Sequence, residues 1–95
     1  MSKKHIRYFS IVNPWIDFVV TVNESDSAKA TGAIYDGIEA FCEDGDSGWC
    51  YGDYVETALT NADITYDIMY HDSEDMSDEY EEKWEASLPK NCETI

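Results

Sequence analysis

Basic side chains are almost absent from the middle of this chain. Between Asp36 and Glu85 there are seventeen carboxylates and a single base, Lys83, so this stretch carries about sixteen negative charges (seventeen minus one). The whole chain has 21 acidic and 6 basic residues, which leaves four acids and five bases for the remainder. Repulsion at this density destabilises a compact fold, so we infer that the negative field serves a function.

Long apolar runs are also missing. No stretch approaches the roughly eighteen apolar residues of a membrane-spanning helix, and no apolar run follows Lys3 and Lys4 as in a secretory signal peptide. We therefore expect a cytoplasmic protein. The strong negative charge argues against binding to membrane surfaces and against direct binding to nucleic acid, since both are anionic.

Groups typical of catalysis or metal binding are scarce. The cysteines, Cys42, Cys50 and Cys92, match no zinc-binding or redox spacing, so we expect reduced thiols, with a Cys42–Cys50 disulfide as an alternative. His71 is followed by acidic residues, but the second histidine, His5, is far away in the sequence and no nucleophile is visibly paired with either. We expect no enzymatic activity, no cofactor and no metal site.

The chain nevertheless has the composition of a folded protein. Hydrophobic residues make up 43% of it and aromatic residues 14%, which is too much for a disordered acidic tail. Its 95 residues suffice for one small domain. We expect a single acidic α+β domain over residues 1–95, with residues 1–4 and 90–95 frayed.

Hydrophobic periodicity predicts three strands. Residues 16–23 and 64–70 alternate between two faces, and residues 5–12 are rich in aromatic and β-branched side chains. Asn13 and Pro14 indicate a turn between the first two strands.

Three helices are predicted between and after these strands. One covers residues 27–43, with an apolar stripe at three- and four-residue spacing, and a second covers residues 54–61, with Asp53 as its N-cap. Ser77 is the expected N-cap of the third, which Pro89 ends. The order β-β-α-α-β-α predicts a small three-stranded, mainly antiparallel sheet with the helices on one face.

Two helical rows of carboxylates are the first candidate binding surfaces. The Cβ atoms of residues three or four positions apart on a helix lie about 5–6 Å from one another. Such rows on a rigid scaffold could imitate the phosphates of duplex DNA, which follow one another every 3.4 Å or so along a strand, and attract a basic groove. The rows consist of Asp36, Glu39 and Glu43, and of Asp78, Glu81, Glu82 and Glu85. A solvated acidic face that only keeps the protein soluble is the alternative.

A loop between the first two helices is the second candidate. It combines Trp49 and Tyr51 with Asp44, Asp46 and Asp53, and aromatic rings beside carboxylates suit the recognition of arginine. The alternative is that the two rings form a lid over the core. The loop begins like a calcium-binding loop, but its later ligand positions are wrong.

These features predict a small non-enzymatic protein that covers a basic, nucleic-acid-binding surface of another protein. By composition alone it resembles the small inhibitors that phages and mobile elements direct against CRISPR or restriction enzymes. One alternative is a homo-oligomeric accessory subunit, such as a homodimer, with a solvated acidic face. A divalent-cation-binding protein is a third hypothesis.

Overall fold

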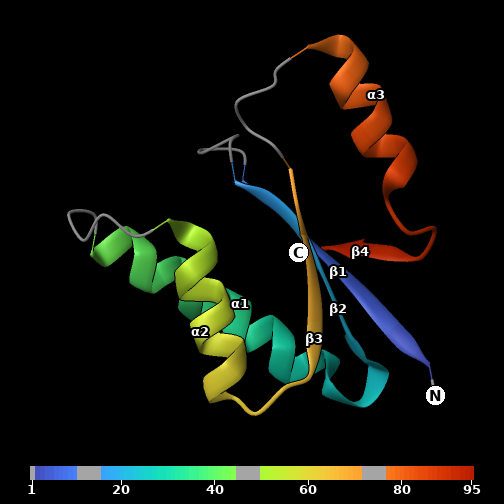
Figure 1. The fold of residues 1–95 in the computed structure, drawn as a ribbon. Helices are drawn as coiled ribbons and strands as arrows, with labels where there is room; N and C mark the ends of the chain where they lie inside the picture. Colours follow the sequence, from blue (N-terminus) through green and yellow to red (C-terminus); the bar gives the residue numbers. More distant parts are fainter. Residues whose placement is uncertain (1, 11–15, 45–49, 72–76) are drawn as a thin grey trace.

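The structure is a computed structural model of the chain that describes residues 2–10, 16–44, 50–71 and 77–95. Within these residues the elements follow one another as β1 (Lys3–Phe9), β2 (Asp17–Asn23), the 3-10 helix η1 (Glu24–Asp26), α1 (Ser27–Glu43), α2 (Tyr51–Asn61), β3 (Tyr66–Tyr70), α3 (Asp78–Ser87) and β4 (Cys92–Thr94). Figure 1 shows their arrangement.

The strands form a mixed four-stranded sheet in the order β3-β2-β1-β4. β2 pairs antiparallel with both β1 and β3, whereas β1 pairs parallel with β4. The α+β class is confirmed, but the expected three-stranded antiparallel sheet is wrong. The missing strand β4 has only three residues, too few for an alternating pattern, and it lies in the segment that was expected to fray.

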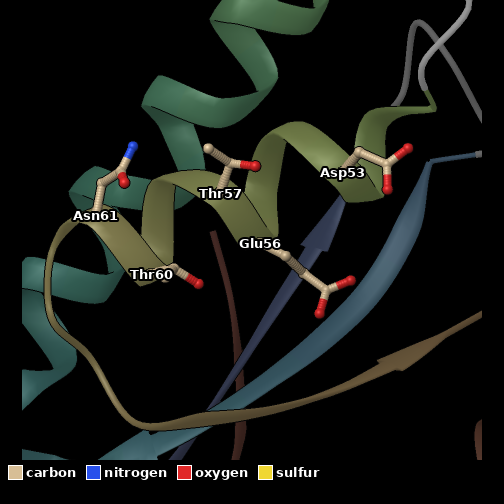
Figure 2. A pocket seen from close by; sticks show the side chains of 5 residues that line it. All are labelled: Asp53, Glu56, Thr57, Thr60 and Asn61. Atoms are coloured by element: carbon tan, nitrogen blue, oxygen red, sulfur yellow. The ribbon is translucent and has the colours of Figure 1, made fainter.

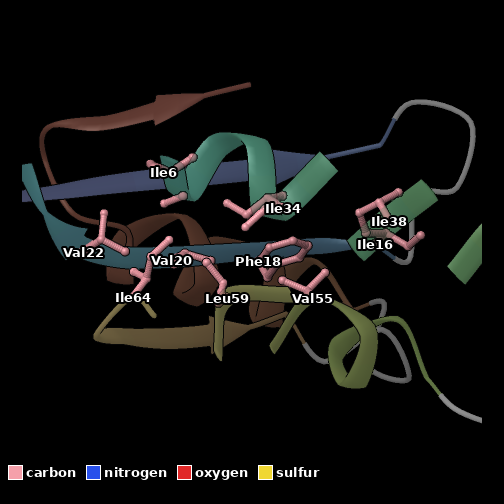
Figure 3. Close-up of a cluster of buried hydrophobic side chains, with 12 residues drawn as sticks. Ile6, Ile16, Phe18, Val20, Val22, Ile34, Ile38, Val55, Leu59 and Ile64 are labelled. Carbon is pink, nitrogen blue, oxygen red and sulfur yellow. The ribbon is translucent and has the colours of Figure 1, made fainter. Parts of the chain in front are cut away.

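The main core lies between the sheet and the helices α1 and α2. Phe18, Val20 and Val22 of β2 point to this side together with Ile6 of β1, because alternate residues of a strand face the same way. Ile34 of α1 and Val55 and Leu59 of α2 meet them, as Figure 3 shows. This confirms the apolar stripe expected for residues 27–43, whose bounds match α1.

The two helices of this layer cross closely at one glycine. A methyl group on Gly37 of α1 would lie 2.7 Å from the Cα of Val55 and 3.0 Å from the carbonyl oxygen of Tyr54. Only a residue without a Cβ therefore fits here. The close crossing places the exposed faces of α1 and α2 side by side.

The third helix lies on the opposite face of the sheet, which corrects the expectation that all helices cover one face. Asp17 and Val19 of β2 point away from the main core and are buried, at 3% and 2% exposure. Trp84 of α3 contacts Asp17 there through its indole nitrogen. The sheet is thus covered by α1 and α2 on one side and by α3 on the other (Figure 1).

Two helix starts were predicted from capping residues, with different results. Ser77 caps α3 as expected, since its hydroxyl accepts a hydrogen bond from the backbone N–H of Tyr80 at 3.2 Å. The prediction for α2 is wrong. This helix begins at Tyr51, so Asp53 lies in its first turn and Cys50 is the N-cap.

The strand bounds also differ from the sequence pattern. β1 begins two residues before the expected strand 5–12, whose end lies outside the described residues. β3 begins at Tyr66, two residues after the expected start.

Candidate functional site

Five of the predicted partner-binding residues lie on the layer formed by α1 and α2. They are exposed, and none of them forms an ion pair with another described residue. Lys29 is the sole base within the two helices. We call this set the α1–α2 acidic surface; it consists of Asp36, Glu39, Glu43, Asp44 and Asp53.

One member of the surface is held in place by its neighbour helix. The hydroxyl of Tyr54 on α2 donates a hydrogen bond to Oδ2 of Asp44, at the end of α1, over 2.7 Å. A shallow hollow of about 270 Å³ runs between the two helices, and Asp36, Tyr54 and Thr57 are among the residues that line it. The acidic surface is therefore not flat but grooved along the helix crossing.

The acids of α3 do not form one uniform row. Asp78 and Glu82 are exposed and make no ion pair with a described residue. Glu81 instead binds Nε2 of His71 at 2.7 Å, and Glu85 reaches the guanidinium of Arg7 at 3.4 Å. Two of the four predicted residues thus hold the helix to the sheet.

The two predicted acidic rows lie on opposite sides of the sheet. The α1–α2 acidic surface covers the main-core side, and α3 covers the other (Figure 1). A flat partner surface can therefore contact one of them at a time.

Tyr51, the described ring of the second candidate site, packs against the core. The ring of Tyr51 stacks on Phe18 at 5.6 Å between centroids and meets Phe41 and Tyr70 edge-on. Burial raises the pKa of Tyr51 to about 12. Tyr51 thus takes the place that the core-lid alternative predicted for it. Asp46 and Trp49 lie outside the described residues.

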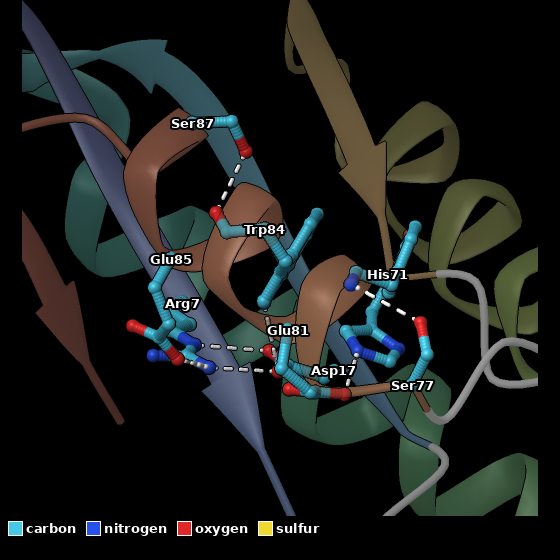
Figure 4. A network of polar contacts seen from close by, with 9 residues as sticks. Arg7, Asp17, His71, Ser77, Glu81, Trp84, Glu85 and Ser87 are labelled. Carbon is cyan, nitrogen blue, oxygen red and sulfur yellow. Dashed lines mark hydrogen bonds and ion pairs between the residues drawn. The ribbon is translucent and has the colours of Figure 1, made fainter.

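A partly buried ion pair between β1 and β2 forms the point where α3 is attached to the sheet, and the sequence patterns did not reveal it. Arg7 donates from Nε to Oδ1 of Asp17 at 2.9 Å and from Nη2 to Oδ2 at 2.7 Å. Trp84 donates to the same Oδ2 at 3.1 Å, as Figure 4 shows. Hydrogen bonding to Asp17 raises the pKa of Arg7. The bidentate geometry and the third donor satisfy a carboxylate that would otherwise be costly to bury.

His71 completes the contacts beneath α3. Its ring lies edge-on to Tyr80 and Trp84, at 5.0 and 5.3 Å, while Nε2 meets Glu81. Its other ring nitrogen is buried and has no hydrogen-bond partner among the described residues. His71 therefore packs α3 against the end of β3, and no described nucleophile is paired with it.

A second groove, between α2 and β3, was not predicted. One surface hollow of about 530 Å³ is lined by Asp53, Glu56, Thr57, Thr60 and Asn61 of α2 (Figure 2). A smaller hollow of about 230 Å³ shares Asp53 and Glu56. The sequence did contain a signal for this groove, because Asp53, Glu56 and Thr60 follow three- and four-residue spacing and so lie on one side of α2.

The smaller hollow is bordered by β3 through Tyr70. The carboxylate of Glu56 is held between two phenols of β3, accepting from Tyr66 at 2.9 Å and from Tyr70 at 2.7 Å. Burial, and then the contact with Glu56, raise the pKa of both tyrosines. Both therefore remain hydrogen-bond donors to Glu56 at neutral pH.

The described residues contain no group of three or more His, Cys, Asp or Glu side chains arranged to hold a metal ion. The three cysteines are free thiols, and burial raises the pKa of Cys92. None of the described helices is both long and apolar enough to cross a bilayer. Comparison with protein families, with curated proteins and with solved structures finds no match to this chain.

Proposed function

We propose that this protein is a non-enzymatic binding protein that covers a basic surface of another protein, one that itself binds nucleic acid. The observation that carries the proposal is the display of five exposed carboxylates without described basic partners on α1 and α2. Exposed carboxylates that no described base neutralises keep their negative charge available to an approaching cation, and the helices fix their relative positions.

The α1–α2 acidic surface is a better candidate than α3 for the principal contact. Glu85 already neutralises part of its charge against Arg7, and Glu81 is engaged by Nε2 of His71. Asp36, Glu39 and Glu43 follow three- and four-residue spacing along one exposed side of α1, so the Cβ atoms of successive members are separated by about 5–6 Å. That distance is of the order of the phosphate spacing that a basic groove recognises.

The direct test is competition with nucleic acid. The partner is first captured from a nuclease-treated lysate of the native host at about 0.05 M salt and released at about 0.5 M, because screening weakens contacts between exposed charges. The purified partner is then loaded with a labelled duplex. We expect this protein to displace the duplex, less efficiently as salt rises. Displacement that does not depend on salt would contradict the proposal.

Charge reversal identifies the face that binds. Glu39→Lys with Glu43→Lys alters the α1–α2 acidic surface, and Asp78→Lys with Glu82→Lys changes the net charge equally on α3. We expect the first pair to lose binding and the second to retain most of it. Reversal of Glu81 or Glu85 is unsuitable, because it would break the contacts that hold α3 to the sheet. Equal loss in both pairs would indicate an effect of net charge alone.

Exposed aromatic rings favour a second candidate function, self-association as an accessory subunit. Phe9 and Tyr35 are 42% and 50% exposed, which is high for large apolar side chains. A molar mass from light scattering at several protein concentrations tests this. A constant mass of one chain would rule self-association out, and a dimer mass abolished by Phe9→Ser with Tyr35→Ser would support it.

A further inference from the structure

The outer edge of β3 is an open hydrogen-bonding edge. The backbone N–H of His71 donates to the carbonyl of Asp17 at 3.0 Å, which sets the pairing of β3 with β2. In an antiparallel pair, alternate residues direct both backbone groups to the same neighbour. Asp67 and Met69 therefore face β2, and the N–H and C=O groups of Tyr66, Ile68 and Tyr70 face outward. No described backbone group pairs with these outward groups.

The two edges of the sheet differ in their protection. β4 has three residues, and its Glu93 pairs with Lys4 of the neighbouring strand. β3 has five residues with neither lysine nor proline, the residues that commonly block edge pairing. Its one charged side chain, Asp67, is negative. Of the two described edges, β3 is thus the one open to an added strand, and it favours a positively charged one.

The groove beside this edge is also acidic. Asp53 and Glu56 line both hollows, and Tyr70 connects the smaller one to β3. Glu56 is oriented by the hydroxyls of Tyr66 and Tyr70, but each carboxylate oxygen can accept a further hydrogen bond. A long cationic side chain lying along the edge of β3 can therefore enter the groove and bind Glu56 without displacing the tyrosines.

We infer that β3 accepts an extended, cationic segment of the partner as a fifth strand, and that an arginine or lysine of this segment binds Asp53 and Glu56. Main-chain hydrogen bonds would give such strand addition its affinity, and the groove its preference for positive charge. Pairing of β3 with a second copy of itself is disfavoured, because it would bring the acidic grooves together. The inference rests on the proposed function, since it specifies how a basic partner is recognised.

A synthetic strand provides the test. The probe is a capped peptide of about eight alternating arginine and valine residues, and its control carries an N-methyl group on every backbone amide. Both peptides have the same charge, but the control has no backbone N–H on either edge to pair with β3. We expect the control to bind the wild-type protein about tenfold more weakly or worse, since it loses several backbone hydrogen bonds. Amide exchange should slow at Tyr66, Ile68 and Tyr70, but not at residues of β4.

Two proline variants test the same edge from the side of the protein. Ile68→Pro removes an outward N–H of β3 and retains the pairing with β2, because proline is tolerated where the missing donor faces solvent. Thr94→Pro is the matched control. Ile95 donates to Arg7 at 2.9 Å, so the N–H of Thr94 points away from β1. We expect Ile68→Pro to weaken peptide binding about tenfold and Thr94→Pro to leave it unchanged.

The outcomes separate this inference from the proposed function. Equal binding of the two peptides, or protection of amides elsewhere, overturns strand addition, while displacement of the labelled duplex can still succeed. Failure of the arginine–valine peptide to bind the folded wild-type protein at low salt also overturns it. The peptide comparison uses the wild-type chain, so it decides the question even where Ile68→Pro fails to fold.

Discussion

Trp84 donates a hydrogen bond from its indole nitrogen to Asp17, 67 positions earlier in the chain, over 3.1 Å. The same carboxylate oxygen, Oδ2, also accepts a hydrogen bond from Nη2 of Arg7 at 2.7 Å. A helix with a strongly polar surface is therefore attached to the sheet by a buried polar group and one aromatic ring. The attachment depends on complete pairing of Asp17, which leads to the first prediction.

Removal of Arg7 should destabilise the protein more than removal of both partners. Arg7→Met leaves the carboxylate of Asp17 buried without a cation, and we expect a loss of about 3 kcal/mol in the free energy of unfolding. Arg7→Met with Asp17→Leu should cost less, because no unpaired charge remains. Urea denaturation of the wild type, both single variants and the double variant measures this. Additive losses would show that the pair does not act as a unit.

Glu81 should contribute to stability where its neighbour does not. Glu81→Ala removes the acceptor of Nε2 of His71, and we expect a loss of about 1 kcal/mol. Glu82→Ala makes the same chemical change one position along the same helix, at an exposed residue without a described ion pair. Thermal unfolding of the two variants compares them. Similar melting temperatures would contradict a stabilising role for the His71 contact.

The two glycines of α1 should respond in opposite directions to alanine. Gly37→Ala forces the backbones of α1 and α2 apart and should destabilise by about 1–3 kcal/mol. Gly32→Ala adds a methyl group with no atom within 4 Å and should stabilise by about 0.5–1 kcal/mol through helix propensity. Chemical denaturation of both variants gives the sign directly. Stabilisation by Gly37→Ala would mean that the helices cross less closely.

Alkaline conditions should weaken the fold through Tyr51. Its pKa is about 12 in the folded chain, against 10.0 for an unperturbed tyrosine, because burial favours the neutral phenol. The stability that comes from burying the neutral phenol of Tyr51 is complete below pH 10 and is lost as the pH rises toward 12. Allowing for the partial exposure of the ring, the loss is on the order of 1 kcal/mol. Unfolding measured from pH 8 to 12 should decline less steeply for Tyr51→Phe, and parallel curves would contradict the assignment.

Local patterns predicted α1, β2 and the Ser77 cap because each is determined by short-range signals. The start of α2 could not be read in this way. Asp53 is a good N-cap by type, but the helix begins earlier, where the ring of Tyr51 stacks on Phe18. Tertiary packing overrides a local capping preference, and the packing partner lies more than thirty positions away.

The second face of the sheet shows a signal that the sequence did contain. Asp17, Val19 and Thr21 occupy the side of β2 that the alternation suggested was exposed, yet Val19 is apolar and buried. An apolar residue there, together with Trp84 on a later helix, indicates a further covering layer. The burial of Asp17 itself could not be deduced from the sequence. A buried carboxylate is tolerable here only because Arg7 lies beside it in the folded chain.

The placement of acids on both sides of the sheet affects how many partners one molecule can engage. Each layer of such a fold adds about 10 Å, so the exposed charges of α1 and those of α3 are separated by more than the Debye length of about 8 Å at physiological ionic strength. Neutralising one side therefore leaves the attraction of the other nearly intact. Under the proposed function, a cationic protein bound on one side would therefore leave the charge of the other side available to a second one.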